Sequence, residues 1–326
     1  MLWQRVLTAL VGIPLLLVLI YLGGWYFAVA VALIAVAGLR ELYRLLERRF
    51  LSVWPWVGYP LATLAVVGAA AGGNLMARTI APLVEGAVLL AAFALSARWL
   101  LTDWPRLAST RLDWLEAAKL MSARRTFPEL LRSYRAGDRV YGFRYPKHEG
   151  LSATLSSHVC VPQLLTYLIR LRNVSLPSIA PRGTDALLPA GALLVMLLMA
   201  VVWGMDTAAY AVGKTWGRHK LCPAISPGKT VEGAIAGFLA AAGLCVATGY
   251  WFGLPVVHGL ILGSAIGILG QAGDLFESLL KRRAGVKDSG IIIPGHGGVL
   301  DRFDSLLFSA PVAFYYLATL EGYFPI

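Results

Sequence analysis

Long apolar segments, separated by charged or Gly/Pro-rich stretches, dominate the pattern of this chain. A helix needs about 20 mostly apolar residues to cross a hydrocarbon core about 30 Å thick. Eight segments form such runs: 6–22, 25–39, 53–71, 80–101, 187–205, 231–252, 254–272 and 306–320. A ninth segment, 151–171, is weaker because Ser156, Ser157 and His158 interrupt it. The pattern predicts an all-α, polytopic integral membrane protein with eight or nine transmembrane helices.

The Lys and Arg residues between these segments predict the orientation, because cytoplasmic connections carry an excess of positive charge. Four connections carry most of it: 40–49, 102–150, 206–230 and 274–304. All four share one side of the membrane only if 151–171 is counted as a span. This arrangement leaves Arg170, Arg172 and Arg182 on the opposite side. We therefore expect a multi-pass protein of the cell inner (plasma) membrane whose polar site faces the cytoplasm.

Three regions follow from the same pattern. Residues 1–101 hold the N-terminal transmembrane helices, and 151–326 form a C-terminal transmembrane region with the candidate catalytic residues. Between them, 102–150 lacks apolar runs and is rich in Lys and Arg. We expect this basic insertion to be a solvated loop outside the membrane. The alternative is a short amphipathic helix at 113–123 that lies on the membrane surface.

Composition supports a membrane protein and removes several other classes. The chain is 58% hydrophobic and 14% charged, whereas a soluble domain carries about 25% charged residues. Its cysteines, Cys160, Cys222 and Cys245, form no CxxC pair, which excludes a disulfide framework and a cysteine zinc site. The formal net charge of +11 fits phosphates and acidic headgroups as partners. It fits the Lys/Arg excess of an inner-membrane protein equally well.

The acidic residues are scarce and unevenly placed. There are 18 of them, and four aspartates fall within one short stretch beside predicted spans: Asp274, Asp288, Asp301 and Asp304. Carboxylates near a bilayer are costly, so their concentration indicates a functional site. The alternative is that these acids only neutralise the Lys and Arg residues of the same loop.

The spacing of these aspartates favours a functional site. Asp301 and Asp304 are three residues apart, so both face one side of a starting helix near its positive end. Gly297 and Gly298, just before them, let the backbone approach a bulky ligand closely. Together with Asp274 these carboxylates suit hard divalent cations, and Mg²⁺ prefers carboxylate oxygens supplemented by phosphate and water. Neighbouring Lys and Arg residues would hold the phosphates that such metals bridge.

A second polar group surrounds the Gly-Lys-Thr sequence at 228–230. A P-loop would need a glycine where Pro223 stands, and no strand is predicted before it, so this is no P-loop. We expect a loop instead. In it, Ser226, Lys229, Thr230 and backbone amides at a helix N-terminus would meet an anion.

The run from Ser278 to Asp304 resembles the C-terminal motif of the phosphatidate cytidylyltransferases, also called CDP-diglyceride synthetases or CDP-diacylglycerol synthases. Every position of that motif is filled in this run. The segments 206–233 and 271–278 agree with the family, and 1–101 agrees more loosely. The resemblance does not extend to 102–150.

The resemblance implies the reaction of CTP with phosphatidate to give CDP-diacylglycerol and pyrophosphate, a step of phospholipid biosynthesis. A phosphate oxygen of phosphatidate attacks the α-phosphorus of CTP in line. Metal ions and fixed cations must screen two polyanions, so catalysis consists of positioning and charge stabilisation. A phosphomonoester has a second pKa of about 6 and is already largely ionised, so a strong general base is unnecessary.

The expected site residues fall into three groups. Catalytic residues are Asp274, Asp288, Asp301, Asp304, Lys287, Arg302 and His296. Substrate-binding residues are Ser226, Gly228, Lys229, Thr230, Lys281, Arg282, Gly297 and Gly298. Metal ligands are Asp274, Asp301 and Asp304, for two Mg²⁺ ions, with a monovalent second ion as an alternative. His296 either donates to phosphate or caps its turn, and Asp206 either binds metal or, as we favour, pairs with a nearby Lys or Arg.

The expected partners are CTP, phosphatidate and the lipid bilayer, with no nucleic acid, and a homodimer stays open. Two other functions fit parts of the pattern. Another membrane lipid-phosphate enzyme, such as one similar to a polyprenol kinase, would also need clustered acids beside spans. A transporter would instead show inverted repeats and charges scattered near span midpoints. Neither of these features is found in the sequence.

Overall fold

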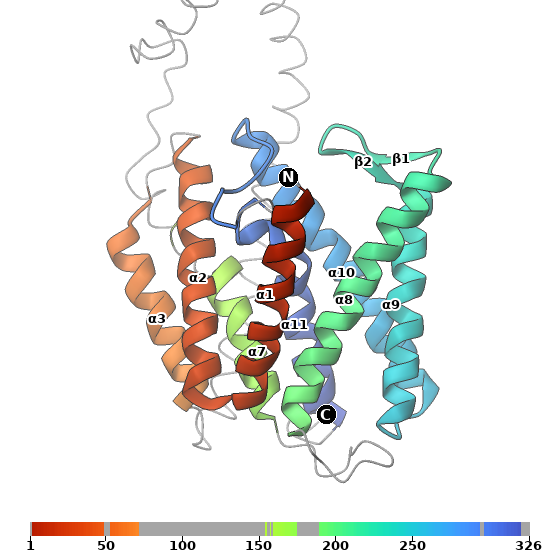
Figure 1. Cartoon of the computed structure of the whole chain (residues 1–326), viewed down its shortest axis with the longest axis horizontal. Coiled ribbons are helices and arrows are strands. Elements are labelled where there is room, and N and C mark those ends of the chain that lie inside the picture. Colours follow the sequence, from red (N-terminus) through yellow and green to blue (C-terminus); the bar gives the residue numbers. More distant parts are fainter. Residues whose placement is uncertain are drawn as a thin grey trace, which may run out of the picture.

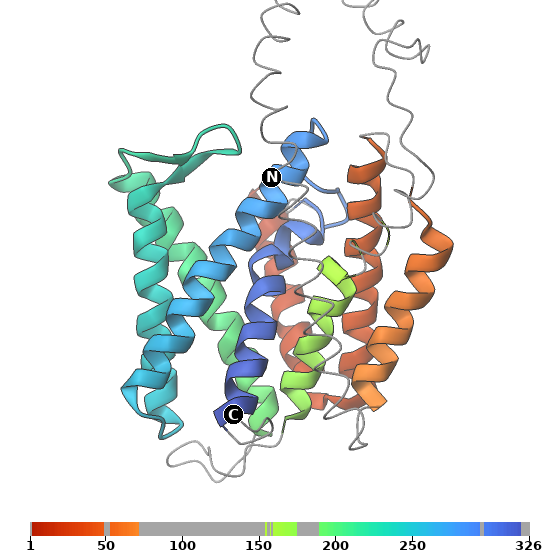
Figure 2. The same ribbon diagram turned by 180° about the vertical axis from the view of Figure 1, so that it is seen from behind.

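The computed structural model describes residues 2–48, 53–71, 154, 157, 159–174, 189–293 and 297–320. Its helices are α1 (Leu2–Leu22), α2 (Gly24–Glu47), α3 (Pro55–Ala71), α7 (Leu164–Asn173), α8 (Ala190–Thr215), α9 (Val231–Trp251), α10 (Val256–Arg283) and α11 (Leu300–Leu320). A π-helical turn at Val159–Gln163 precedes α7. Strands β1 (Lys220–Cys222) and β2 (Ser226–Thr230) pair antiparallel between α8 and α9. The helices stand side by side, and the hairpin lies at one end of the bundle (Figures 1 and 2).

Within these ranges, five helices are long and apolar enough to cross a membrane: α2, α8, α9, α10 and α11. Two further apolar helices are shorter, namely α3 and the part of α1 from Leu7 to Leu22. The prediction of a mostly helical, multi-pass membrane protein is therefore confirmed. The predicted span at 80–101 and the insertion at 102–150 lie outside the described residues.

The described residues of the weakest predicted span, 151–171, lie inside the bundle. Near its start, the Oγ1 of Thr154 accepts a hydrogen bond from the backbone N–H of Trp54 at 2.8 Å. At its end, the Arg172 guanidinium donates to the carbonyl oxygens of Ile20 (2.7 Å) and Tyr21 (3.0 Å). These contacts join the described residues of the segment to the start of α3 and to the end of α1, and its crossing of a membrane stays a prediction.

The contacts of Arg172 explain why a basic residue lies at the end of the bundle away from the hairpin. The last carbonyl groups of a helix have no partner within the helix. Arg172 supplies donors to two such carbonyls where α1 ends, just before Gly23 with its positive φ of 62°. A side chain at Gly23 would collide with this guanidinium, because an added Cβ would lie 2.5 Å from Nη2. Arg172 therefore stabilises the turn between α1 and α2.

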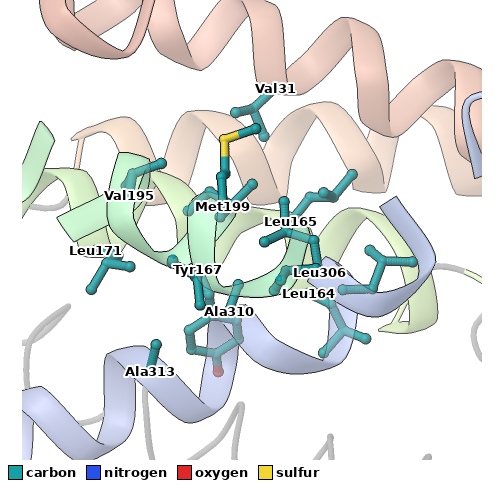
Figure 3. Packing of buried hydrophobic residues seen from close by; sticks show 14 of the residues in the cluster. Val31, Leu164, Leu165, Tyr167, Leu171, Val195, Met199, Leu306, Ala310 and Ala313 are labelled. Carbon is teal, nitrogen blue, oxygen red and sulfur yellow. The ribbon is translucent and has the colours of Figure 1, made fainter. Parts of the chain in front are cut away.

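The hydrophobic core is centred on α7. Figure 3 shows side chains of α2, α8 and α11 around this helix, and the packed residues include Val31, Leu165, Tyr167, Val195, Met199 and Ala310. Tyr167 is fully buried, and its hydroxyl hydrogen-bonds that of Tyr315 at 2.7 Å. Because α7 contacts protein on nearly all sides, it does not need the continuous apolar surface that lipid requires. This explains why its hydropathy signal is weak.

Helices α9 and α10 approach each other closely through glycines. A Cβ added to Gly263 would lie 2.6 Å from the Cα of Ala242 and 2.7 Å from the carbonyl oxygen of Ala241. A Cβ at Gly259 would lie 2.6 Å from the Cα of Val246. Small residues at such positions let transmembrane helices pack backbone against backbone.

We expect Gly263→Ala to lower the free energy of unfolding by roughly 1–3 kcal/mol, because the added methyl group forces these helices apart. Gly243→Ala on α9 is the matched control, since no atom lies within 4 Å of its added Cβ. Alanine also favours helix there. Thermal unfolding of the purified protein in detergent measures both variants. Equal unfolding midpoints for the two variants would contradict the close packing.

Candidate active site

The polar site lies at the end of the bundle that carries the hairpin. Helices α8 and α10 reach this end with their C-terminal parts, and α9 and α11 begin there (Figure 1). Because α10 and α11 are joined at this end, residues late in α10 lie opposite residues early in α11. The fold thus assembles one site from segments that are far apart in the sequence.

Three aspartates from three helices come together: Asp206 of α8, Asp274 of α10 and Asp304 of α11. Each carboxylate is close enough to the other two for mutual electrostatic repulsion. The backbone N–H of Ser305 donates to Asp304 Oδ1 at 2.7 Å. Like charges held together at a membrane protein's end are costly unless a cation neutralises them. We call these three aspartates the carboxylate cluster.

Lys229 provides one positive charge for the carboxylate cluster. It extends from β2, and its Nζ lies 2.6 Å from Asp274 Oδ2. It also attracts the Asp206 carboxylate. The other oxygen of Asp274 accepts a weaker contact from the Ser278 hydroxyl at 3.4 Å. The structure therefore brings together the predicted residues Lys229, Asp274 and Asp304, and it places Asp206 beside them, where both of its predicted roles stay open.

The carboxylate cluster fits Mg²⁺ by its chemistry, because its ligands are hard carboxylate oxygens that repel one another. Over the ranges that the structure describes, no three His, Cys, Asp or Glu side chains already surround a common metal position. Asp274 instead forms an ion pair with Lys229. The metal-binding roles of Asp274, Asp301 and Asp304 therefore stay predictions.

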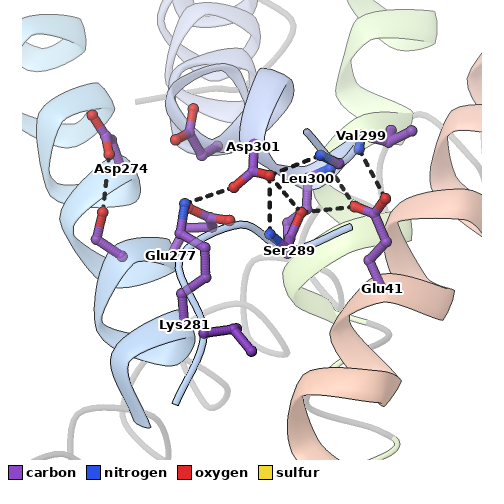
Figure 4. A network of polar contacts seen from close by, with 12 residues as sticks. Glu41, Asp274, Glu277, Lys281, Ser289, Val299, Leu300 and Asp301 are labelled. Atoms are coloured by element: carbon purple, nitrogen blue, oxygen red, sulfur yellow. Dashed lines mark hydrogen bonds and ion pairs between the residues drawn. The ribbon is translucent and has the colours of Figure 1, made fainter. Parts of the chain in front are cut away.

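Asp301 belongs to a neighbouring network (Figure 4). Its Oδ1 lies 2.6 Å from the Nζ of Lys281, which also forms an ion pair with Glu277. Its Oδ2 accepts from the backbone N–H of Ser289 (3.0 Å), from the Ser289 hydroxyl (3.0 Å) and from the backbone N–H of Gly298 (2.8 Å). A metal ion at Asp301 would compete with these four donors. A phosphate at Lys281 would likewise compete with two carboxylates.

Sequence analysis missed the residue on the far side of this network. Glu41 of α2 is fully buried and accepts hydrogen bonds from the Ser289 hydroxyl and from the backbone N–H groups of Val299 and Leu300. Glu41 was not among the predicted site residues. Its position in the sequence gives one indication of burial. Gly38 lies three residues before Glu41 and Leu45 four residues after it, so Glu41 falls on the buried face of α2.

The two glycines before α11 serve the protein's own backbone. Gly297 has a φ of 89°, which favours glycine, and its added Cβ would lie 2.8 Å from Asp301 Oδ2. A Cβ at Gly298 would overlap the Ser289 hydroxyl and the Glu41 carboxylate. The space beside Gly298 is therefore filled by protein. The predicted contact of these glycines with a substrate stays a prediction.

The expectation of an irregular loop before α9 was wrong, because residues 226–230 form strand β2. Its last residue, Thr230, caps α9, since its hydroxyl oxygen accepts from the backbone N–H of Gly233 at 3.1 Å. The backbone N–H of Val231 donates to the His219 carbonyl at 2.9 Å. Glu232 accepts from the backbone of His219 and lies 2.7 Å from its Nδ1. These contacts hold the ends of the hairpin against the start of α9, which places Lys229 beside the carboxylate cluster.

The remaining predicted residues surround this core of the site. Arg282 donates to the carbonyl oxygens of Ile225 (3.0 Å) and Val286 (3.1 Å), which fastens the hairpin to the end of α10. Three predicted residues have exposed side chains: Lys287, Asp288 and Arg302. Gly228 is exposed and Ser226 half-buried on β2. His296 lies outside the described residues. The roles of all these residues in binding or catalysis stay predictions.

Comparison with known proteins gives consistent similarities. The family described as "Cytidylyltransferase family" matches residues 3–320. A phosphatidate cytidylyltransferase of Synechocystis sp. is 32% identical over 333 residues, which covers 97% of each chain. A phosphatidate cytidylyltransferase of Bacillus subtilis is 48% identical over 122 residues, covering 36% of this chain and 45% of the relative. The uncharacterized protein YnbB of Escherichia coli is 47% identical over 128 residues, covering 39% and 43%.

Proposed function

Because this chain belongs to the cytidylyltransferase family, we propose that it transfers the cytidylyl group of CTP to phosphatidate and releases pyrophosphate. The observation that supports this most strongly is the carboxylate cluster with Lys229 at one end of a membrane-spanning bundle. Such a site can bring together a water-soluble triphosphate and a phosphate headgroup whose acyl chains stay in the bilayer. The product is CDP-diacylglycerol.

The reaction balances without an oxidant, a reductant or a strong base. A phosphate oxygen of phosphatidate attacks the α-phosphorus of CTP and forms a new P–O–P linkage. The bond between the α-phosphorus and the oxygen that bridges to the β-phosphorus breaks, and pyrophosphate leaves with that electron pair. The attacking oxygen is already largely ionised near neutral pH, since its pKa is about 6. The protein's task is to place two anions in line and to stabilise charge.

The chain's own residues divide this task between them. Lys229, held on the hairpin, neutralises phosphate charge beside Asp274. Asp206, Asp274 and Asp304 would hold Mg²⁺, whereas Asp301, which the sequence also suggests as a ligand, keeps Lys281 and the start of α11 in place. The bound magnesium supplies charge neutralisation for the triphosphate oxygens. Whether a second ion is Mg²⁺ or monovalent is read from the ion dependence of the rate.

The site faces the cytoplasm of the cell inner membrane in this proposal. CTP is a water-soluble cytoplasmic nucleotide, and the hairpin end carries exposed Lys and Arg residues: Lys214, Arg218, Lys220, Arg282 and Lys287. The positive-inside rule assigns such an end to the cytoplasm. Labelling of a single cysteine placed at Lys220 by an impermeant reagent, in intact cells and in inverted vesicles, tests this orientation.

We expect Lys229→Gln to lower kcat/KM for CTP by about 10- to 100-fold, because a charge-assisted contact to phosphate is lost. Lys214→Gln is the matched control. This lysine lies exposed at the same end of the bundle, where its Nζ donates to the Tyr210 hydroxyl at 3.5 Å and lies 5.6 Å from the centre of the Tyr210 ring. Initial rates at varied CTP concentration measure both variants. Equal values for both variants would remove Lys229 from the nucleotide site.

The function itself is tested with the full-length protein purified in detergent, mixed with CTP, phosphatidate and Mg²⁺. The expected result is a CDP-lipid identified by mass spectrometry, with one pyrophosphate for each lipid formed. Diacylglycerol in place of phosphatidate gives no product, because it lacks the attacking phosphate. If correctly folded protein forms no CDP-lipid from CTP and phosphatidate, the proposed function is wrong.

A further inference from the structure

We propose that Glu41 is a positioning residue for the reaction. Its buried carboxylate on α2 holds Ser289, Val299 and Leu300 in place and thereby fixes where Asp301 and Asp304 stand. The inference rests on the proposed function. It concerns the N-terminal region of the chain, where α2 brings Glu41 to the network around Asp301.

The contacts of Glu41 join segments that are far apart in the sequence. Glu41 Oε1 accepts from the backbone N–H of Val299 at 3.0 Å, and Oε2 accepts from that of Leu300 at 2.9 Å. Oε2 also accepts from the Ser289 hydroxyl at 2.9 Å. Leu300 is the first residue of α11, so the carboxylate satisfies N–H groups where this helix begins. A negative charge is favourable at a helix N-terminus.

The loop before α11 is built closely around this carboxylate. A Cβ added to Gly290 would overlap Glu41 Oε1, and one added to Gly298 would overlap Oε2. The Glu41 side chain is 0% exposed. No substrate phosphate reaches a group that is enclosed in this way. Glu41 therefore acts through the loop it holds.

Ser289 connects Glu41 to the catalytic side of the network (Figure 4). Its hydroxyl lies 2.9 Å from Glu41 Oε2 and 3.0 Å from Asp301 Oδ2, so the two carboxylates share its single proton. Its backbone N–H donates to the same Asp301 oxygen at 3.0 Å. Asp301 in turn binds Lys281, and Asp304 follows one helical turn later on α11. A displacement of the Glu41 contacts would therefore move both aspartates.

The glutamine variant tests the acceptor role with little change in shape. A carboxylate offers two acceptor oxygens, whereas an amide offers one oxygen and an NH₂ group that only donates. In Glu41→Gln, that NH₂ group must face the N–H of Val299 or of Leu300, so at least one buried donor loses its acceptor. Glu47→Gln is the control, because Glu47 lies exposed on the same helix.

The experiment compares the two full-length variants in detergent by hydrogen–deuterium exchange and by kinetics. For Glu41→Gln, we expect amides of residues 289–303 to exchange faster by about tenfold or more. We also expect kcat to fall by about 10- to 100-fold, as is typical when a group that orients a ligand is lost. The KM for CTP should stay within about threefold, because Lys229 is held by the hairpin and not by α2. Glu47→Gln should match the unaltered protein in all three measurements.

Each outcome decides the inference. Exchange and kcat equal to those of Glu47→Gln would overturn it, and so would faster exchange with an unchanged kcat, which indicates a purely structural role. If Glu41→Gln does not accumulate, Ser289→Ala is measured instead. A normal kcat in Ser289→Ala would then overturn the inference, and a reduced kcat at unchanged KM would support it. Should the unaltered protein form no CDP-lipid, the proposed function fails while the exchange comparison still tests the Glu41 contacts.

Discussion

Asp274→Asn should lower CDP-lipid formation by about 10²- to 10³-fold without destabilising the protein. Asp274 contacts Lys229 at 2.6 Å and shares the carboxylate cluster with Asp206 and Asp304. The substitution removes one negative charge from a group of mutually repelling carboxylates, so the folded state loses repulsion. Activity falls because the same charges must hold Mg²⁺ and order Lys229. The expected combination is therefore a large loss of rate with an equal or higher unfolding temperature.

The measurement pairs initial rates at saturating CTP, phosphatidate and Mg²⁺ with thermal unfolding of the same preparation. Glu47→Gln again serves as the control, since it removes an exposed acid of the same bundle end. A rate within about threefold of the unaltered protein would contradict the role of the carboxylate cluster. A lower unfolding temperature would show instead that Asp274 is needed for the fold.

Asp301→Asn should lose both activity and stability, which sets it apart from Asp274→Asn. In the unaltered protein, the Asp301 carboxylate accepts from Lys281, from the backbone N–H groups of Ser289 and Gly298, and from the Ser289 hydroxyl. An asparagine side chain would turn its NH₂ group toward one of these donors and remove one of the two negative partners of Lys281. Breaking a buried ion pair from one side costs about 3–5 kcal/mol.

Chemical or thermal unfolding of Asp301→Asn in detergent measures this loss, and the rate is scored per folded molecule. We expect the rate to fall by about 10²-fold or more, because Asp304 and the start of α11 shift with the network. An Asp301→Asn protein as stable as the unaltered one would show that the four donors do not depend on this carboxylate. The opposite effects of the two aspartate variants on stability are thus a direct check of the two networks.

The membrane character of the fold follows from the sequence, because apolar runs report directly on contact with lipid. Helix α7 shows where this signal fails. Its buried residues face protein, so polar residues such as Thr166, and Gln163 just before the helix, are tolerated. The hydropathy of the segment is therefore low. All five long apolar helices were predicted, but α2, α8 and α10 continue 8 to 11 residues beyond the predicted ends and α11 begins six residues earlier, because the apolar pattern stops where a helix becomes polar. The hairpin was missed, because strands of three and five residues carry too short a pattern to distinguish from a loop.

The site could be predicted where its residues lie in one short motif. The motif contains Asp301 and Asp304, Asp274 lies four residues before it, and Lys229 stands at a recognisable helix start. The sequence could not show that Asp206 lies beside Asp274 and Asp304, because α8 and α10 meet only through tertiary packing. It also could not show that Glu41 supports α11, since more than 250 residues separate it from Leu300. Contacts between distant helices depend on packing geometry, which no local pattern contains.

The central claim is that the cytidylyl group of CTP, which contains the α-phosphorus, is transferred to phosphatidate. Two labels follow the phosphorus atoms of CTP through the reaction. Purified protein, phosphatidate and Mg²⁺ are incubated with CTP labelled at the α-phosphorus in one sample and at the γ-phosphorus in another. The account predicts that the α-label enters the lipid and the γ-label leaves in pyrophosphate. A γ-label in the lipid would indicate a kinase, and that result, or the absence of label from the lipid in both samples, would contradict the account.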